Sequence, residues 1–191
     1  SDLRPQFLAI VSSHALVAYL NKDEITKPDG YVIEGHVAGG HNAPPRNRKS
    51  KDDEGNPIYT EQDDADLVKI LNSGSPFWLA GGYATPEKVR EALAAGAQGV
   101  QVGSLFALAD ESGFTAELKS EVIDALKSGE LTVKTDGSAS PTGFPFKVAV
   151  LPESLSDDDK YEKRNRICDL GYLRTPFERE NGGVGYRCPS E

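Results

Sequence analysis

The sequence has no methionine, two cysteines and few positive charges for its length of 191 residues. Lys and Arg number 21 against 30 Asp and Glu, which gives a formal net charge of −9. This deficit argues against nucleic acid and anionic membrane surfaces as partners, because both attract clustered Lys and Arg. Long apolar runs are also lacking, because Phe7–Val11 and Phe77–Ala80 are far too short to cross a bilayer. We expect no secretion signal, since no charged segment followed by an apolar run stands at the start of the sequence. We therefore expect a globular, cytoplasmic protein.

The two cysteines, Cys168 and Cys188, both lie in the C-terminal tail. They lack CxxC spacing, and no histidine follows His41 to complete a zinc site nearby. We expect reduced structural thiols, with a tail disulfide or an intermolecular zinc site as alternatives. The first residue is Ser1, and the absence of methionine is compatible with a piece of a longer protein.

Strand-like and helix-like segments alternate over the first two thirds of the chain. Short apolar runs predict strands at Phe7–Val11, Tyr31–Ile33, Phe77–Ala80 and Gly99–Gly103. Helices are expected after Ser12-Ser13, after a cap at Asp63 or Asp64, over Thr85–Gly96 and over Thr115–Lys127. Such alternation predicts an α/β fold of parallel strands with helical crossovers. We expect this domain to cover residues 1–130, followed by an irregular extension, 131–191, that wraps on it or is partly mobile.

Glycines follow three of the four predicted strands: Gly35 with Gly39-Gly40, then Gly81-Gly82, then Gly103. In parallel α/β folds, ligands bind at the carboxyl ends of the strands. Glycine there lets backbone N–H groups approach a ligand, and two such turns on adjacent strands are typical of a phosphate site. The alternative is that these glycines only make tight turns.

Two histidines surround the first glycine pair in GHVAGGHNAPPR, Gly35–Arg46. A metal site built from His36 and His41 is not expected, because neither has a carboxylate or third ligand at helical spacing. We interpret His36 as a structural or loop residue and His14 as a surface or core-edge residue. The polar segment Asn42–Gln62 is long enough to be a covering loop.

Two segments carry a resemblance to a known family. AGGYATPEKVREALAAGAQGVQVGSLF, Ala80–Phe106, resembles the phosphate-binding segment of FMN-dependent (β/α)8 oxidoreductases. With GHVAGGH before it, the similarity narrows to the nitronate monooxygenases, also called 2-nitropropane dioxygenases. ASPTGFPFK (Ala139–Lys147) and CDLGYLR (Cys168–Arg174) resemble a longer, actinobacterial-type branch of that family.

The resemblance implies that the chain is the C-terminal half of a TIM (β/α)8 barrel, about strands five to eight. A whole barrel needs eight strands and about 250 residues. A half-barrel has open edge strands and an uncovered apolar face. Its expected partner is therefore the missing N-terminal half or a second copy of itself.

The resemblance also implies roles for individual residues. His41 matches the family histidine beside the flavin and is expected to be the catalytic base or to position the nitronate. A neutral imidazole suits proton abstraction α to a nitro group. Ala38, Gly39 and Gly40 are expected to pass close to the flavin ring. The FMN phosphate is expected to be held by Ala80, Gly81, Gly82, Gln101, Gly103 and Ser104.

The function implied is the flavin-dependent oxidation of an alkyl nitronate by O₂ to a carbonyl compound and nitrite, as part of a longer enzyme. The piece alone is expected to be inactive. A flavin-dependent enoyl-reductase of fatty-acid synthesis is a second reading, because it uses a similar barrel and a similarly placed histidine. A third is a non-catalytic module that binds a phosphate ligand or serves assembly.

Overall fold

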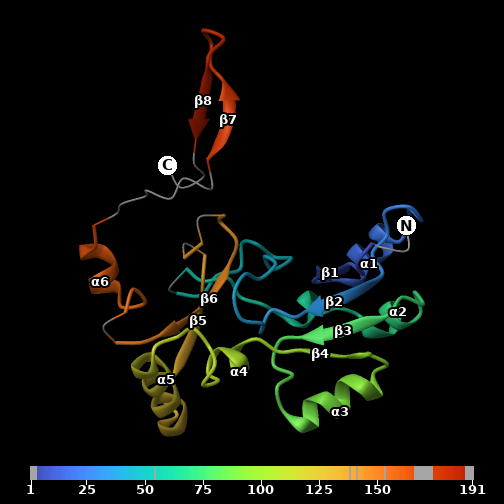
Figure 1. Ribbon diagram of the computed structural model, residues 1–191, viewed down its shortest axis with the longest axis horizontal. Coiled ribbons are helices and arrows are strands. Elements are labelled where there is room, and N and C mark those ends of the chain that lie inside the picture. Colours follow the sequence, from blue (N-terminus) through green and yellow to red (C-terminus); the bar gives the residue numbers. More distant parts are fainter. Residues whose placement is uncertain are drawn as a thin grey trace.

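The computed structural model describes residues 4–53, 55–137, 139–140, 142–152, 154–165 and 174–187. Cys168 and Cys188 lie outside the described residues, as does most of the segment Cys168–Arg174. The described chain forms one four-stranded parallel sheet with helices, followed by two antiparallel hairpins (Figure 1). This α/β architecture confirms the fold class expected from the sequence.

The parallel sheet contains β1 (Leu8–Val11), β2 (Gly30–Glu34), β3 (Phe77–Ala80) and β4 (Gly99–Gln101). The helices of this part are α1 (His14–Leu20), the 3-10 turn η1 (Glu61–Asp63), α2 (Leu67–Leu71), α3 (Pro86–Ala94), α4 (Ser104–Ala107) and α5 (Ala116–Ser128). The remaining elements are β5 (Thr132–Asp136), β6 (Phe146–Val150), α6 (Asp158–Lys163), β7 (Thr175–Glu178) and β8 (Val184–Arg187).

The strands lie in sequence order, β1-β2-β3-β4, with every pairing parallel. One row across the sheet joins Val11 to Ile33, Ile33 to Leu79 and Leu79 to Val100. Alternate side chains of a strand point to opposite faces, so this row shares one face. That face packs in the hydrophobic core against Val17 of α1, Ile70 of α2 and Ala92 of α3. All four carboxyl ends therefore point to one edge of the sheet.

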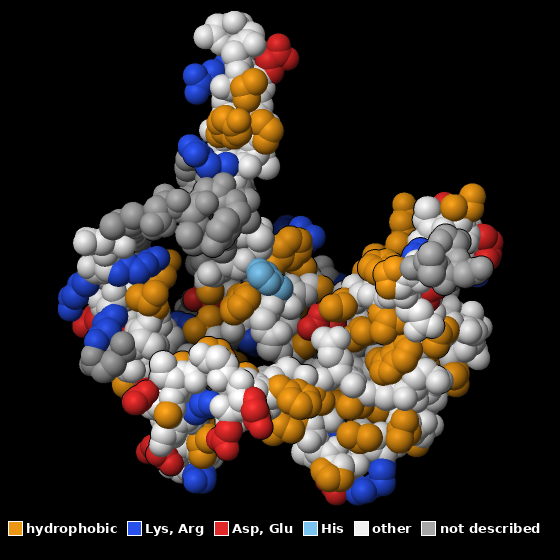
Figure 2. All heavy atoms as spheres, in the orientation of Figure 1, with side chains coloured by type: hydrophobic (Ala, Val, Ile, Leu, Met, Phe, Trp, Pro, Cys, Tyr) orange, Lys and Arg blue, Asp and Glu red, His pale blue; other side chains and the backbone are white. Residues whose placement is uncertain are grey.

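The opposite face of the sheet carries Trp78 between two glycines of neighbouring strands. A Cβ atom added at Gly30 would lie 3.0 Å from the Trp78 ring, and one added at Gly99 would lie 3.1 Å from it. The indole ring of Trp78 therefore fills the space that side chains at positions 30 and 99 would otherwise occupy. Ile10, on the same face of β1, is 57% exposed. Hydrophobic side chains are visible over this part of the molecule in Figure 2.

Two local expectations differ from the structure. Helix α2 is capped by Asp66, whose side chain accepts a hydrogen bond from the N–H of Lys69, and not by Asp63 or Asp64. Asp63 instead forms a capping box with Thr60 around η1. The predicted fourth strand also ends earlier, at Gln101, since the chain turns at Gly103 into α4. Two acidic residues three positions apart therefore stabilise the starts of two different helices: Asp63 that of η1 and Asp66 that of α2.

The extension contains more regular structure than its sequence indicates. β5 and β6 form an antiparallel hairpin with Asp136 opposite Phe146, and β7 and β8 form a second one. The β7–β8 hairpin projects away from the other described elements (Figure 1). The sequence did not predict these short strands, because the segments that connect them are rich in Gly, Ser and Pro. Among the described residues, no helix is long and apolar enough to cross a membrane.

We predict that Gly30→Ala destabilises the sheet by about 1–3 kcal/mol, the usual cost of overpacking. The new Cβ would meet the backbone oxygen of Pro76 at 2.9 Å as well as the Leu8 and Trp78 side chains. Gly113→Ala is the matched control, because a Cβ there has nothing within 4 Å. Chemical denaturation of the two variants measures the difference. Equal stabilities would contradict the packing described around Trp78.

Candidate active site

The loop after β2 folds over the end of β3. The N–H of Gly35 donates to the carbonyl of Ala80 at 3.2 Å, which extends the β2–β3 pairing by one residue. The chain then turns, with the N–H of Ala38 donating to the carbonyl of Gly35 at 3.0 Å. The segment Ala38–His41 is thereby held at the carboxyl edge of the sheet.

Two glycines allow the strand-end loops to touch. Gly81 has φ +95°, and a Cβ there would lie 3.0 Å from the backbone nitrogen of Ala38. A Cβ at Gly39 would lie 3.4 Å from Oγ of Ser104 at the start of α4. Gly81 therefore needs the smallest residue, both for this close approach and for its positive φ, whereas Gly39 lies at ordinary contact distance from Ser104. The loops after β2, β3 and β4 meet here, and they include most of the residues expected to bind the cofactor.

The turns after β3 and β4 present free backbone donors. Among the described residues, the backbone N–H groups of Gly82 and Ser104 donate no hydrogen bond. A Cβ at Gly103 would have nothing within 4 Å, so space remains beside this turn. Ala80 pairs with Gln101 across the two strands. The Ala80 side chain is buried, whereas Gln101 is exposed at the sheet edge.

The extension reaches the same loop through β6. His41 forms an isolated antiparallel bridge with Phe146. The N–H of Lys147 donates to the carbonyl of Gly40 at 2.9 Å, and the N–H of Asn42 donates to the carbonyl of Pro145 at 2.8 Å. The start of β6 therefore pairs with the backbone on both sides of His41.

The imidazole of His41 is held by two side chains of the extension. Its Nε2 lies 2.6 Å from Oγ of Ser140, and its ring meets that of Phe146 edge-on, with centroids 4.8 Å apart. Ser140 is buried; its Oγ lies 2.7 Å from Oγ1 of Thr142 and also accepts from the N–H of Thr142. Nδ1 of His41 has no hydrogen-bond partner among the described residues. The ring is thus fixed through one nitrogen, and the other remains available.

The buried side chain of Asn42 stabilises the loop after β2. Its Nδ2 donates to the carbonyl of Ala38 at 3.0 Å. This hydrogen bond links the two ends of the segment Ala38–Asn42, which contains Gly39 and Gly40. Asn42, the residue directly after His41, therefore holds this segment in place.

His36 contacts the covering loop and takes no part in the contacts of His41. Its ring stacks on Tyr59, with centroids 4.8 Å apart and an interplanar angle of 8°. Nδ1 of His36 lies 3.5 Å from a carboxylate oxygen of Asp64. Tyr59 in turn donates its hydroxyl to the carbonyl of Ala43, and burial raises the pKa of Tyr59. His36 therefore anchors the segment Asn42–Gln62 beside the strand end.

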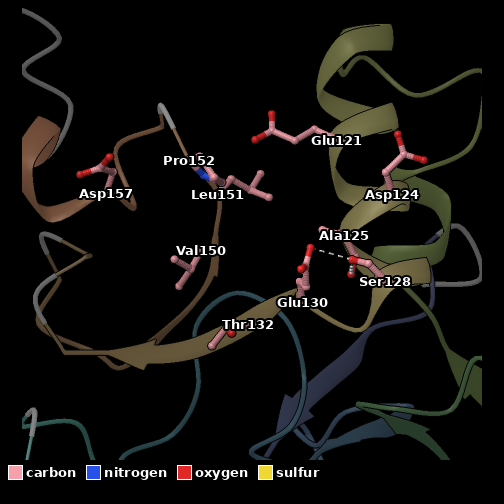
Figure 3. A pocket seen from close by; sticks show the side chains of 10 residues that line it. All are labelled: Glu121, Asp124, Ala125, Ser128, Glu130, Thr132, Val150, Leu151, Pro152 and Asp157. Carbon is pink, nitrogen blue, oxygen red and sulfur yellow. Dashed lines mark hydrogen bonds between the residues drawn. The ribbon is translucent and has the colours of Figure 1, made fainter.

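His14 and a separate cleft lie outside this group of residues. His14 accepts from the N–H of Asp66 at 3.4 Å and so connects the starts of α1 and α2. The cleft, of about 690 Å³, lies between α5 and the β5–β6 hairpin (Figure 3). Four carboxylates are among its lining residues: Glu121, Asp124, Glu130 and Asp157. None of the expected site residues lines it. Within the described ranges, no group of three or more His, Cys, Asp or Glu is arranged to hold a metal ion.

Residues 7–141 match the family described as nitronate monooxygenase. The chain belongs to this family. Among solved structures, it is similar to FabK from Thermotoga maritima, with a TM-score of 0.52, 21% identity and coverage of 83% of this chain. It is also similar to a nitroalkane oxidase from Streptomyces ansochromogenes, with a TM-score of 0.52, 22% identity and coverage of 73%. A search of curated proteins gave no match.

This chain spans 44% of the length of the FabK chain and 37% of the length of the nitroalkane oxidase chain. Both relatives are TIM-barrel enzymes. Residues 7–141, which match the family, include the four-stranded sheet. Its two edge strands, β1 and β4, are unpaired on their outer sides in the described structure. This agrees with the half-barrel implied by the sequence.

Sequence reasoning singled out the histidine and the glycines, which the structure brings to one edge of the sheet, but it missed the residues that orient the histidine. Ser140 and Phe146 lie about a hundred residues downstream, in a segment that looks irregular. Their one signal was the motif ASPTGFPFK, which contains both residues and resembles part of the family. Asn42 gave no signal, because an Asn at the start of a polar loop is ordinary.

We predict that Ser140→Ala changes the tautomer balance of the neutral His41 ring, because Nε2 loses the hydroxyl that lies 2.6 Å from it. The ¹⁵N NMR spectrum of the imidazole should change from one dominant tautomer to a mixture. Ser128→Ala is a matched control, since that hydroxyl bonds only within its own helix end, to Ala125 and Glu130. An unchanged His41 spectrum in Ser140→Ala would show that Ser140 does not set the tautomer.

Proposed function

We propose that this chain, completed to a whole barrel, binds FMN and oxidises alkyl nitronates with O₂ to a carbonyl compound and nitrite. Membership of the nitronate monooxygenase family supports a flavin-dependent oxidoreductase. The observation that carries the proposal is the meeting of three strand-end loops around an oriented histidine. Gly39 lies against Ser104, Gly81 lies against Ala38, and Ser140 holds His41.

The residues at this edge fit FMN in two respects. The unpaired N–H groups of Gly82 and Ser104 suit the phosphate, and the open space beside Gly103 leaves room for it. Ala38, Gly39 and Gly40 offer backbone without bulky side chains, which suits a flat ring. Ala80, Gly81 and Gln101 complete the set that would hold the cofactor. When bound, the flavin accepts electrons from the substrate and passes them to O₂.

His41 would work through Nδ1. The Ser140 hydroxyl has one proton, and when this is donated to Oγ1 of Thr142, Oγ is left to accept from Nε2–H of His41. Nδ1 then holds a free lone pair, which can take a proton from the carbon next to a nitro group. Once protonated, Nδ1–H can donate a hydrogen bond to an oxygen of the nitronate that this forms. Because Nε2 keeps its proton in both states, the bond to Ser140 survives the proton transfer and stabilises the imidazolium.

The barrel would be completed by four more β/α units. The open edges of β1 and β4, and the exposure of Ile10 at 57% on the face opposite the helices, support this requirement. The units come from the rest of a longer polypeptide or from a second copy of this chain. Solution mass with and without a co-expressed N-terminal half distinguishes the two sources.

We predict that His41→Ala, in the barrel-complete protein, lowers kcat for nitronate oxidation by about 10²–10⁴-fold, the usual contribution of a positioned acid–base group. FMN affinity should change little, because the proposed phosphate donors lie in the turns after β3 and β4. His36→Ala is the matched control, since His36 contacts Tyr59 and Asp64 and not the ring of His41. It should keep close to the wild-type rate. An undiminished rate in FMN-loaded His41→Ala would overturn the role of His41.

Two competing functions give different results in the same assays. An enoyl-reductase would consume NAD(P)H with an enoyl thioester and would not release nitrite from nitronates. A non-catalytic assembly module would form a stable dimer and show no response to titration with FMN. Nitrite release that depends on FMN and on His41 rejects both.

A further inference from the structure

The β7–β8 hairpin has one covered face and one open face. Phe177 lies opposite Gly185 in the register of the two strands, and the neighbouring pair points to the other face. The Phe177 ring fills the place of a side chain at position 185, because a Cβ atom added there would lie 2.7 Å from it. The guanidinium of Arg187 lies over the same ring, 5.7 Å from its centroid. This face is therefore packed within the hairpin itself.

The open face carries Pro176, Val184 and Tyr186. Val184 is 64% exposed and Tyr186 is 57% exposed, since the hairpin projects away from the other described elements (Figure 1). Arg174 adds a positive charge beside this face, with its guanidinium 5.7 Å from the centroid of the Tyr186 ring. Hydrophobic and basic side chains lie together on the hairpin in Figure 2. An exposed apolar face bordered by charge is typical of a surface that binds another protein.

The cleft between α5 and the β5–β6 hairpin has the complementary character (Figure 3). Apolar side chains line it from both sides: Ala125, Val150, Leu151 and Pro152. Among the described residues, none of its four carboxylates forms an ion pair, whereas Asp158 and Asp159 nearby are paired with lysines. Glu121 and Asp124 lie one turn apart on α5, and both are exposed. The cleft therefore combines apolar surface with negative charge that no cation neutralises.

We propose that the β7–β8 hairpin of one copy of this chain docks in the cleft between α5 and the β5–β6 hairpin of a second copy. Val184 and Tyr186 then contact the apolar lining, and Arg174 approaches the carboxylates of α5. Opposite charges of this kind orient two surfaces and speed their association. Within one copy, the hairpin and α5 are widely separated (Figure 1), so the cleft that the hairpin reaches belongs to the partner.

Exchange of hairpins gives a closed, symmetric dimer. Each copy offers one hairpin and one cleft, so a two-fold axis repeats the contact and leaves neither surface free. The contact lies apart from the open sheet edges, β1 and β4, and does not depend on how the barrel is completed. The cleft is built on the β5–β6 hairpin, whose other end holds the His41 ring through Phe146. The dimer therefore stabilises the element that orients this histidine.

The test is the mass of the barrel-complete protein by sedimentation equilibrium, because its barrel edges are paired and cannot join two copies. The wild type should be a dimer. Arg174→Glu should raise the dissociation constant of the dimer by roughly 10- to 100-fold, since it places like charges in the contact. The double variant Glu121→Lys, Asp124→Lys should do the same from the cleft side. Tyr186→Ala should weaken the dimer through loss of an aromatic anchor.

A mixture of the two charge-reversed proteins shows which cleft the hairpin occupies. In a mixed dimer, one contact keeps Arg174 against the two acids of α5, and the other contact has both charges reversed. Both contacts are then complementary, whereas neither variant forms a complementary contact with itself. Mixing should therefore restore dimers that contain one copy of each variant, which also shows that both variants are folded. A hairpin docked in its own cleft would give no dimer on mixing.

Two controls make the same charge changes elsewhere. Arg187→Glu alters the covered face of the hairpin, and the double variant Asp110→Lys, Glu111→Lys alters an exposed turn before α5 that does not line the cleft. Both should keep a dissociation constant close to that of the wild type. A monomeric wild type, controls that weaken the dimer equally, or a mixture that stays monomeric overturns the inference. None of these results bears on flavin binding, so the proposed function is tested separately.

Discussion

The close approach of Gly81 to Ala38 is the constraint on which the candidate site depends. With a positive φ and no Cβ, Gly81 lets the turn after β3 lie against the backbone of the histidine loop. The same loop then meets Ser104 through Gly39. A larger residue at Gly81 would separate the loop Ala38–His41 from the turn after β3. The parallel sheet supplies the common edge, and the glycines allow the three loops to converge on it.

The extension completes the site from the other side. The start of β6 pairs with the backbone around His41, while Ser140 and Phe146 hold its ring. The covering loop is anchored separately, through the stack of His36 on Tyr59. The two histidines of one short motif therefore serve different partners: one faces the extension and the other faces the loop.

The sequence predicted local structure well where the signal was local. Thr85 and Pro86 mark the start of α3, and the four apolar runs mark the strands, because caps and alternation depend on near neighbours. The glycines were found for the same reason. The orientation of His41 was not predictable, since Ser140 reaches it only through a hairpin of weak strand propensity.

The most direct measurement is the structure of the barrel-complete protein with FMN bound. We expect the phosphate on the N–H groups of Gly82 and Ser104, and the flavin ring beside Gly39. Nδ1 of His41 should face the substrate side of the ring, with Nε2 still bonded to Ser140. A phosphate bound elsewhere, or a His41 ring turned away from the flavin, would contradict the assignment of this edge of the sheet as the active site.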